Sequence, residues 1–186
     1  MTHGPDDSPR AASDRRFHHQ RSEIATALHA LLGARCCPEP LGDADRAAAL
    51  AVEAWATHRD AEPNSWAVAR RQWTCEHREH LVGLLHAISA RLGSRPTWLV
   101  VPGREPQVVP VPSDAVLDNP LGFAALAGYE LLLSDQAVPA GLWLMRHAHD
   151  ASGSDAVTWE LEVWGEPWLS ATTRALRECP ETGELG

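Results

Sequence analysis

The sequence predicts an α+β fold in which an N-terminal helical layer packs on a C-terminal sheet layer. Up to residue 93, apolar residues recur at the spacing of amphipathic helices. From residue 97 onward, short runs rich in Val, Leu and Trp end at Gly, Pro, Ser or Asp, which is typical of strands and turns. No Ser/Gly-rich linker separates the two parts. We therefore predict one domain over residues 22–178, with a helical layer at 22–93 and a sheet layer at 97–178.

Three helices make up the predicted helical layer. Residues 1–21 precede them and contain almost no aliphatic side chains, so we expect a disordered tail there. The first helix covers residues 22–33, between a serine that can cap it and a glycine that can end it. The second begins at Asp43 or Asp45, and the third runs from about Ser65 to Leu92.

Four or five strands make up the predicted sheet, which we expect to be mainly antiparallel. Residues 97–101 and 107–111 are rich in Val and predict a hairpin. Pro110 lacks a backbone N–H, so the second of these strands must lie at a sheet edge or contain a bulge. Residues 129–133 predict a buried strand.

The central feature of the predicted sheet is a second hairpin at residues 141–166. Its turn falls at residues 150–155, because Gly, Ser and Asp tolerate tight turns while both flanks are rich in Trp, Leu and Val. Between the two hairpins, residues 113–119 form either a short helical turn or a loop. Pro167 can take the first position of a C-terminal helix. We expect residues 179–186 to be a frayed tail.

The register of this hairpin predicts which side chains share a face. If the turn centres on its Ser-Gly pair, Met145 lies opposite Glu160 and Trp143 lies opposite Glu162. Side chains alternate along a strand, so the core side carries Leu142, Leu144, Trp159, Leu161 and Val163. The other face, called here the hairpin face, carries Trp143, Met145, His147, His149, Thr158, Glu160, Glu162 and Trp164.

The composition is that of a globular protein without the basic surface that nucleic-acid binding needs. Hydrophobic residues make up 44% of the 186 residues, and the net charge is −9. Phosphate backbones are bound by Lys and Arg clusters that release counterions, so we expect no nucleic-acid partner. All 16 basic residues are Arg. Mechanisms that need a lysine, such as Schiff-base catalysis and the P-loop, are therefore excluded.

The sequence also predicts a soluble, cytoplasmic protein with reduced cysteines. The first residues lack the apolar segment of a signal peptide, and no run approaches the ~20 apolar residues of a membrane helix. Cys36 and Cys37 are adjacent, with Cα atoms about 3.8 Å apart, whereas a relaxed disulfide spans about 5.5 Å. We therefore expect neither a disulfide scaffold nor a membrane-spanning segment.

The missing catalytic motifs favour a binding or regulatory module that engages a protein partner, of an adaptor or immunity type. The chain has no Gly-x-Ser-x-Gly elbow and no Gly-rich phosphate loop. We expect Trp143 and Trp164 to be exposed and to act as apolar anchors on the hairpin face. Glu160 and Glu162 would surround them and tune the association rate. Arg146 would be available to pair with a carboxylate.

The alternative function is a metal-dependent enzyme or a metal-binding protein. His147 and His149 share a strand face, and the predicted register places Glu160 and Glu162 on that face. Imidazole nitrogen and carboxylate oxygen are ligands of divalent metals such as zinc. His149 and Glu160 lie several positions apart along the ladder, so only a shifted register or a third element would complete the site. Whether the protein is an enzyme stays open at this point.

A second possible pair of metal ligands lies in the third predicted helix, where His77 and His80 are one turn apart. Cys75 is close in sequence, but in a regular helix its side chain points about 160° away from that of His77. The three residues therefore cannot share one ion on this helix. The two histidines would form half of a site that other residues complete.

The spacing of Gly141, five residues, and then His147-Ala-His149 resembles the first half of the cupin metal motif. The same His-x-His pattern is similar to that of the JAMM metalloproteases. The cupin motif continues with a glutamate four or five residues after the second histidine. Here Asp155 comes six residues after His149, and Glu160 comes eleven residues after it. The JAMM proline and its spaced Ser and Asp are also missing. We assign the chain to neither family.

Overall fold

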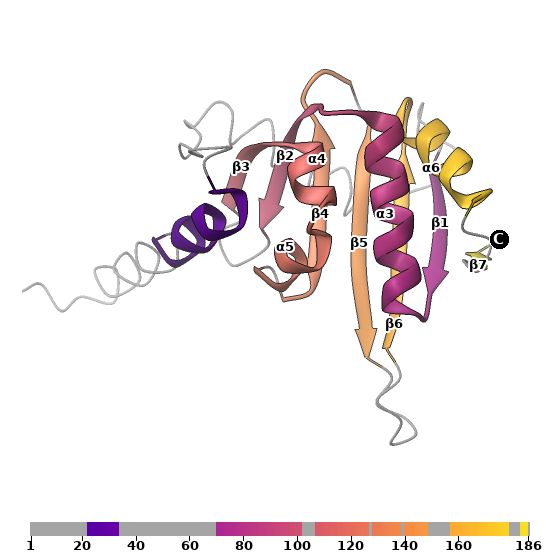
Figure 1. The fold of residues 1–186 in the computed structure, drawn as a ribbon, viewed down its shortest axis with the longest axis horizontal. Coiled ribbons are helices and arrows are strands. Elements are labelled where there is room, and N and C mark those ends of the chain that lie inside the picture. The colour runs from indigo at the N-terminus through magenta and orange to yellow at the C-terminus, as the bar shows by residue number, and fades with distance from the viewer. Residues whose placement is uncertain are drawn as a thin grey trace, which may run out of the picture.

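The computed structural model describes residues 22–33, 70–101, 107–126, 128–138, 140–148, 157–178 and 183–185. These residues form a seven-stranded sheet in the order β3-β2-β4-β5-β6-β1-β7, and every pair of neighbouring strands is antiparallel. Helices cover one face of this sheet (Figure 1). The predictions of an α+β fold and of an antiparallel sheet are confirmed, but the sheet has seven strands rather than the four or five predicted, because β1 and β7 come from segments predicted as helix and as tail.

The described elements have the following residue ranges. The strands are β1 (Arg70–Cys75), β2 (Pro96–Val101), β3 (Gln107–Pro112), β4 (Glu130–Asp135), β5 (Gly141–Ala148), β6 (Val157–Trp164) and β7 (Gly183–Leu185). A first helix at residues 22–32 precedes them. The other described helices are α3 (Arg78–Leu92), α4 (Ser113–Leu117), α5 (Pro120–Leu126) and α6 (Trp168–Leu176).

The third predicted helix is wrong in its first part. Residues 70–75 form strand β1, which pairs with β6, and α3 begins only at Arg78. The sequence favours a helix here because Trp73 and Leu81 fit one helical stripe, but both also fit a strand followed by a new helix. Pairing with a strand far away in the sequence decides between the two. The described residues therefore do not show the N-terminal three-helix layer that the sequence predicts.

The hairpin of β5 and β6 has the predicted register. Trp143 lies opposite Glu162, and Met145 lies opposite Glu160. The core side of the two strands is also as predicted, because Leu142, Leu144 and Val163 are fully buried under the helices. The alternation of apolar and polar residues was sufficient here, because a one-residue slip would turn every leucine toward the opposite face.

The main hydrophobic core lies between the sheet and the helices that cover it. In α3 the buried side chains include Leu81, Leu84 and Ile88, which recur at the spacing of one helical face. Leu28 from the first helix joins the same core, as does Trp168 from α6. A smaller cluster lies on the opposite face of the sheet and contains Val100, Val108, Leu132 and Trp164, with Trp98 and Trp143 packed against it.

The two edges of the sheet differ from the prediction in one respect. β3 is an edge strand, as its proline requires. Residues 183–185 belong to the segment that we expected to be frayed, but they form β7, which pairs with β1 at the other edge.

The predicted tail at 1–21 and the second predicted helix lie outside the described residues. No helix in the described part of the chain is long and apolar enough to cross a membrane.

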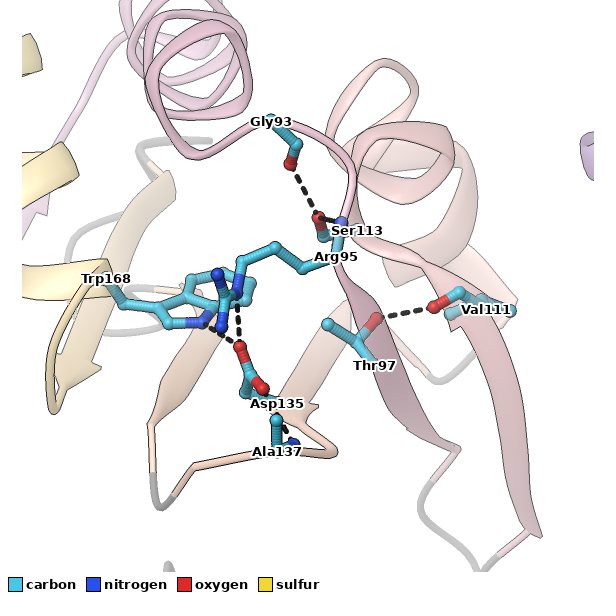
Figure 2. A network of polar contacts seen from close by, with 8 residues as sticks. All are labelled: Gly93, Arg95, Thr97, Val111, Ser113, Asp135, Ala137 and Trp168. Carbon is cyan, nitrogen blue, oxygen red and sulfur yellow. Dashed lines mark hydrogen bonds and ion pairs between the residues drawn. The ribbon is translucent and has the colours of Figure 1, made fainter.

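At one end of the helix-covered face, a buried carboxylate is surrounded by hydrogen-bond donors (Figure 2). We call this end of the face the closed end. Asp135, at the end of β4, has a fully buried side chain. It accepts hydrogen bonds from Arg95 Nε at 2.5 Å, from the Ala137 backbone N–H at 2.9 Å and from Trp168 Nε1 at 3.3 Å. These contacts connect the residues before β2, the end of β4 and the start of α6.

Hydrogen bonds from three donors explain why the carboxylate of Asp135 is stable as a charged group although it is buried. Burial alone raises the pKa of Asp135, but the donors Arg95, Ala137 and Trp168 outweigh it and hold the pKa below its ordinary value. Next to this cluster, Ser113 Oγ accepts from the Arg95 backbone N–H at 3.1 Å and donates to Gly93 O at 3.2 Å. The closed end is therefore a fully bonded structural network.

Candidate functional site

The hairpin face lies on the side of the sheet away from the helices, and its polar groups form a chain of hydrogen bonds. His147 Nε2 lies 3.0 Å from Glu160 Oε2. Gln72 of β1 donates to Glu160 Oε1 at 3.2 Å and to Glu162 Oε2 at 3.1 Å. Gln72 was not among the predicted site residues, since the sequence places it in a helix. The two glutamates are thus held by a neighbouring strand rather than left as separate surface charges.

Two residues of this face are buried, contrary to the prediction. Trp164 is 2% exposed and Glu162 is 4% exposed. Trp164 packs across its register partner Gly141, where an added Cβ would lie only 2.6 Å from Trp164 Cζ2. Glycine at this position makes room for the indole ring. Trp164 is thus a packing residue and cannot be an exposed anchor in the described structure.

The remaining predicted residues are distributed over both faces. Trp143 is half-buried, and its Nε1 donates to Glu130 Oε1 at 2.7 Å. Arg146 lies on the helix-covered face, because it stands at the register position opposite the buried Trp159. It therefore cannot pair with the glutamates of the hairpin face. Binding of a protein partner to this face stays a prediction that rests on Trp143 and Glu160.

The predicted metal ligands are only partly within the described structure. His147 and Glu160 are adjacent, whereas His149 lies outside the described residues. His77 occupies the N-cap position of α3 without a side-chain capping bond, and its ring contacts that of His80 edge to face, with centroids 5.2 Å apart. Across the described ranges, no three His, Cys, Asp or Glu side chains are grouped closely enough to hold a metal ion. The metal site stays a prediction.

Cys75 shows no sign of an activated nucleophile. Burial raises the pKa of its thiol, and the thiol donates a hydrogen bond to the backbone oxygen of His77. A reactive cysteine needs a lowered pKa and access to solvent. Cys75 is buried in the core beside Trp73, so it is a structural residue.

A pocket of about 700 Å³ opens at the end of the helix-covered face that lies opposite the closed end. This volume falls within the range of roughly 300–1,000 Å³ that is usual for small-molecule sites. Its lining residues come from the strands β5 and β6, from the helices α3 and α5, and from the residues that precede α3, α5 and β4. Its lining residues are Glu76, Arg78, Asn119, Leu121, Gly122, Ala125, Tyr129, Arg146, Val157 and Trp159.

One side of the pocket is an aromatic wall, which consists of Tyr129 and Trp159, with Arg146 next to the tyrosine ring. The guanidinium carbon of Arg146 lies 4.6 Å from the centroid of the Tyr129 ring, within the distance of a cation–π contact. The Tyr129 ring meets the Trp159 ring edge to face, with 6.5 Å between centroids. Trp159 is buried, whereas Tyr129 is 45% exposed. The aromatic pair therefore extends from the buried core at Trp159 to the solvent-exposed surface at Tyr129.

The backbone before β4 explains how Tyr129 reaches this position. Gly128 has a φ of +70°, and the Tyr129 N–H bonds to Ala124 O at 2.7 Å. This is the six-to-one bond of a Schellman cap with glycine at its left-handed position, which ends α5. Tyr129 also has a φ of +70°, a conformation that costs a non-glycine residue about 1–3 kcal/mol. Its backbone oxygen accepts from the Arg146 N–H at 3.2 Å, which holds the strained residue against β5.

The opposite side of the pocket comes from the starts of two helices. Glu76 and Arg78 lie just before and at the first turn of α3, and both are exposed. Asn119 precedes α5, and Gly122 lies in its first turn. A Cβ built on Gly122 would lie 2.7 Å from Asn119 Nδ2. Since only a flexible, exposed side chain stands in its way, a larger residue at this position would occupy the pocket.

The charges of the pocket differ from those of the whole chain. Two arginines and one glutamate line it, which gives a local net charge of +1, whereas the chain carries −9. The ion pairs found among the described residues are Arg91–Glu178, Arg95–Asp135 and His147–Glu160. Neither Arg78 nor Arg146 takes part in them. Within the described part of the chain, no carboxylate therefore forms a direct ion pair with either arginine.

Comparison with protein-family models, with curated proteins and with solved structures finds no match to this chain. The pocket residues come from five separate segments, and only Arg146 and Trp159 were singled out from the sequence. The Gly-Tyr pair after an apolar helix could have indicated the cap at Gly128 and the unusual position of Tyr129. No sequence pattern indicates that Arg78 lies at the same pocket.

Proposed function

We propose that the protein is a binding or regulatory module and that the pocket at the open end of the helix-covered face takes its ligand. The observation that carries this proposal is the pair of arginines, Arg78 and Arg146, which have no carboxylate partner among the described residues and lie at a pocket that also contains Tyr129 and Trp159. Charged groups that converge beside aromatic and aliphatic side chains in a concave pocket are usual features of a binding site. The strained conformation of Tyr129 also supports a functional role, because such strain concentrates at ligand sites.

Ligand-induced stabilisation tests this proposal. A ligand that binds only the folded protein stabilises it by about 2.7 kcal/mol at a hundredfold excess over its Kd. We would screen small anions, cations and neutral ring compounds by thermal unfolding of the wild-type chain and of Gly122→Leu. We expect at least one compound to raise the Tm of the wild type by several degrees and to leave that of Gly122→Leu unchanged.

Gly83→Leu is the matched control for this experiment. Gly83 lies on the exposed side of α3, and a Cβ there meets nothing within 4 Å. This variant should respond to ligands as the wild type does, because the pocket stays open. A ligand that raises the Tm of all three proteins equally would bind elsewhere and would contradict the assignment of the pocket.

A second candidate function is metal binding at the hairpin face, favoured by the 3.0 Å contact of His147 Nε2 with Glu160 Oε2. These are two suitable ligand atoms on neighbouring strands. Metal analysis of the purified full chain tests the idea. Stoichiometric zinc, iron or manganese that is lost in His147→Ala and retained in His86→Ala would support it. A folded protein that contains no metal after incubation with these ions would exclude it.

A further inference from the structure

We infer that the ligand of the pocket is a planar aromatic ring that carries a carboxylate. This inference deepens the proposed function and rests on it. The pocket combines a surface for a ring with a local positive charge, and a ligand that uses both must be planar and anionic. A purely apolar ligand would leave two arginines without a counter-charge, and a small inorganic anion would leave the aromatic wall uncovered.

The ring-binding part of the pocket consists of Tyr129, Trp159 and the apolar side chains around them. Val157, Leu121 and Ala125 complete this part. The edge-to-face contact of the two rings, whose planes are 71° apart, holds Tyr129 and Trp159 in a fixed relative orientation, so a flat ligand meets aromatic side chains that are already ordered. Ring stacking on aromatic side chains is favourable because it buries a large apolar area with little loss of conformational freedom.

The anion-binding part consists of Arg146 and Arg78. A guanidinium group presents five N–H donors in a planar fork that matches the two oxygens of a carboxylate. The contact of Arg146 with the Tyr129 ring holds its guanidinium group beside the ring-binding wall. A carboxylate attached directly to the ring would thus lie next to a cation that is already in place. Glu76 opposes a second negative charge, which favours one carboxylate over two.

Titration calorimetry with the full chain tests this inference, using 2-naphthoate as the probe and 2-naphthamide as its neutral counterpart. We expect the naphthoate to bind at least about tenfold more tightly than the amide, because only the carboxylate forms a charge-assisted bidentate pair. In Arg146→Gln this preference should fall below about threefold. Arg174→Gln removes an exposed arginine on α6 that does not line the pocket. It should keep the full preference.

Three outcomes would overturn the inference. The first is that the wild type binds the amide as tightly as the naphthoate. The second is a preference for naphthoate that survives in both Arg146→Gln and Arg78→Gln. The third is that 2-naphthyl phosphate binds more tightly than 2-naphthoate and loses its advantage in Arg146→Gln, which would identify a phosphate as the anionic group.

The same measurements separate the failure of this inference from the failure of the proposed function. If 2-naphthoate does not bind but another compound stabilises the wild type and not Gly122→Leu, the pocket is a ligand site and the carboxylate assignment is wrong. If no compound distinguishes the wild type from Gly122→Leu, the proposed function itself is wrong. Thermal unfolding of each variant without ligand shows that it is folded before the titration is interpreted.

Discussion

Arginine side chains lie at both ends of the helix-covered face, but their surroundings are opposite. At the closed end, Arg95 donates to the buried carboxylate of Asp135. At the pocket, Arg78 and Arg146 have no carboxylate partner among the described side chains. One end is internally neutralised, and the other keeps a positive charge beside an aromatic surface. Thus the presence of a fixed counter-charge, and not the residue type, distinguishes a structural arginine from one available to a ligand.

Removing the carboxylate at the closed end should produce the largest loss of stability. Asp135→Ala leaves the buried Trp168 Nε1 and the Ala137 N–H without their acceptor and separates Arg95 from its partner. Breaking a buried pair on one side costs about 3–5 kcal/mol. Urea unfolding measures this loss. Asp114→Ala removes a half-exposed carboxylate that bonds to Ser94 and should cost less than about 1 kcal/mol. Equal losses would contradict the structural role of the closed end.

Replacing one arginine at each end tests the comparison directly. Arg95→Gln leaves a buried carboxylate without its charged donor, and we expect a loss of about 2 kcal/mol in the free energy of unfolding. Arg146→Gln removes only a cation–π contact, worth about 0.5–1 kcal/mol at an exposed site. Urea unfolding of the two variants should therefore rank Arg95→Gln as the less stable. If Arg146→Gln is as destabilised as Arg95→Gln, the arginine at the pocket has a structural role.

Acidification should weaken the closed end. Burial raises the pKa of Asp135, but the three donors prevail, so its folded-state pKa lies below the ordinary value of 3.8. A lowered folded-state pKa stabilises the protein above the unfolded-state pKa, and this contribution is lost as the pH falls through the folded-state pKa. Between pH 5 and pH 2, the wild type should therefore lose more unfolding free energy than Asp135→Asn does. Parallel pH profiles of the two proteins would exclude this residue as a source of acid sensitivity.

The smallest expected effect concerns the strained backbone at the pocket. Tyr129→Gly and Tyr129→Ala remove the same ring, but only glycine adopts a φ of +70° without a steric cost. The glycine variant should be the more stable of the two by about 1 kcal/mol. At Gly83, in the interior of α3, the order should be reversed, and Gly83→Ala should stabilise the protein by about 0.5–1 kcal/mol. Thermal and urea unfolding of the three variants measure both differences.

The sequence was sufficient where local pattern and pairing agree. The β5–β6 register followed from the alternation of leucines with polar residues and from the turn between them, and Trp143 lies opposite Glu162 as predicted. The helix that ends at Leu92 followed from the spacing of its apolar residues. The position of β3 at a sheet edge followed from Pro110, which cannot donate a hydrogen bond to a second neighbour.

Tertiary structure decided the features that depend on residues far apart in the chain. Residues 70–75 become a strand because β6 offers them a partner, and a short apolar segment does not specify such pairing by itself. Trp164 is buried because it packs against Gly141 of the neighbouring strand, and Glu162 is buried between the neighbouring strands. The pocket arises where α3 and α5 meet β5, β6 and the residue before β4, so it could not be located from any one segment. Local periodicity determines which face of an element is apolar, whereas the packing of distant elements determines which charges are neutralised and which remain available to a ligand.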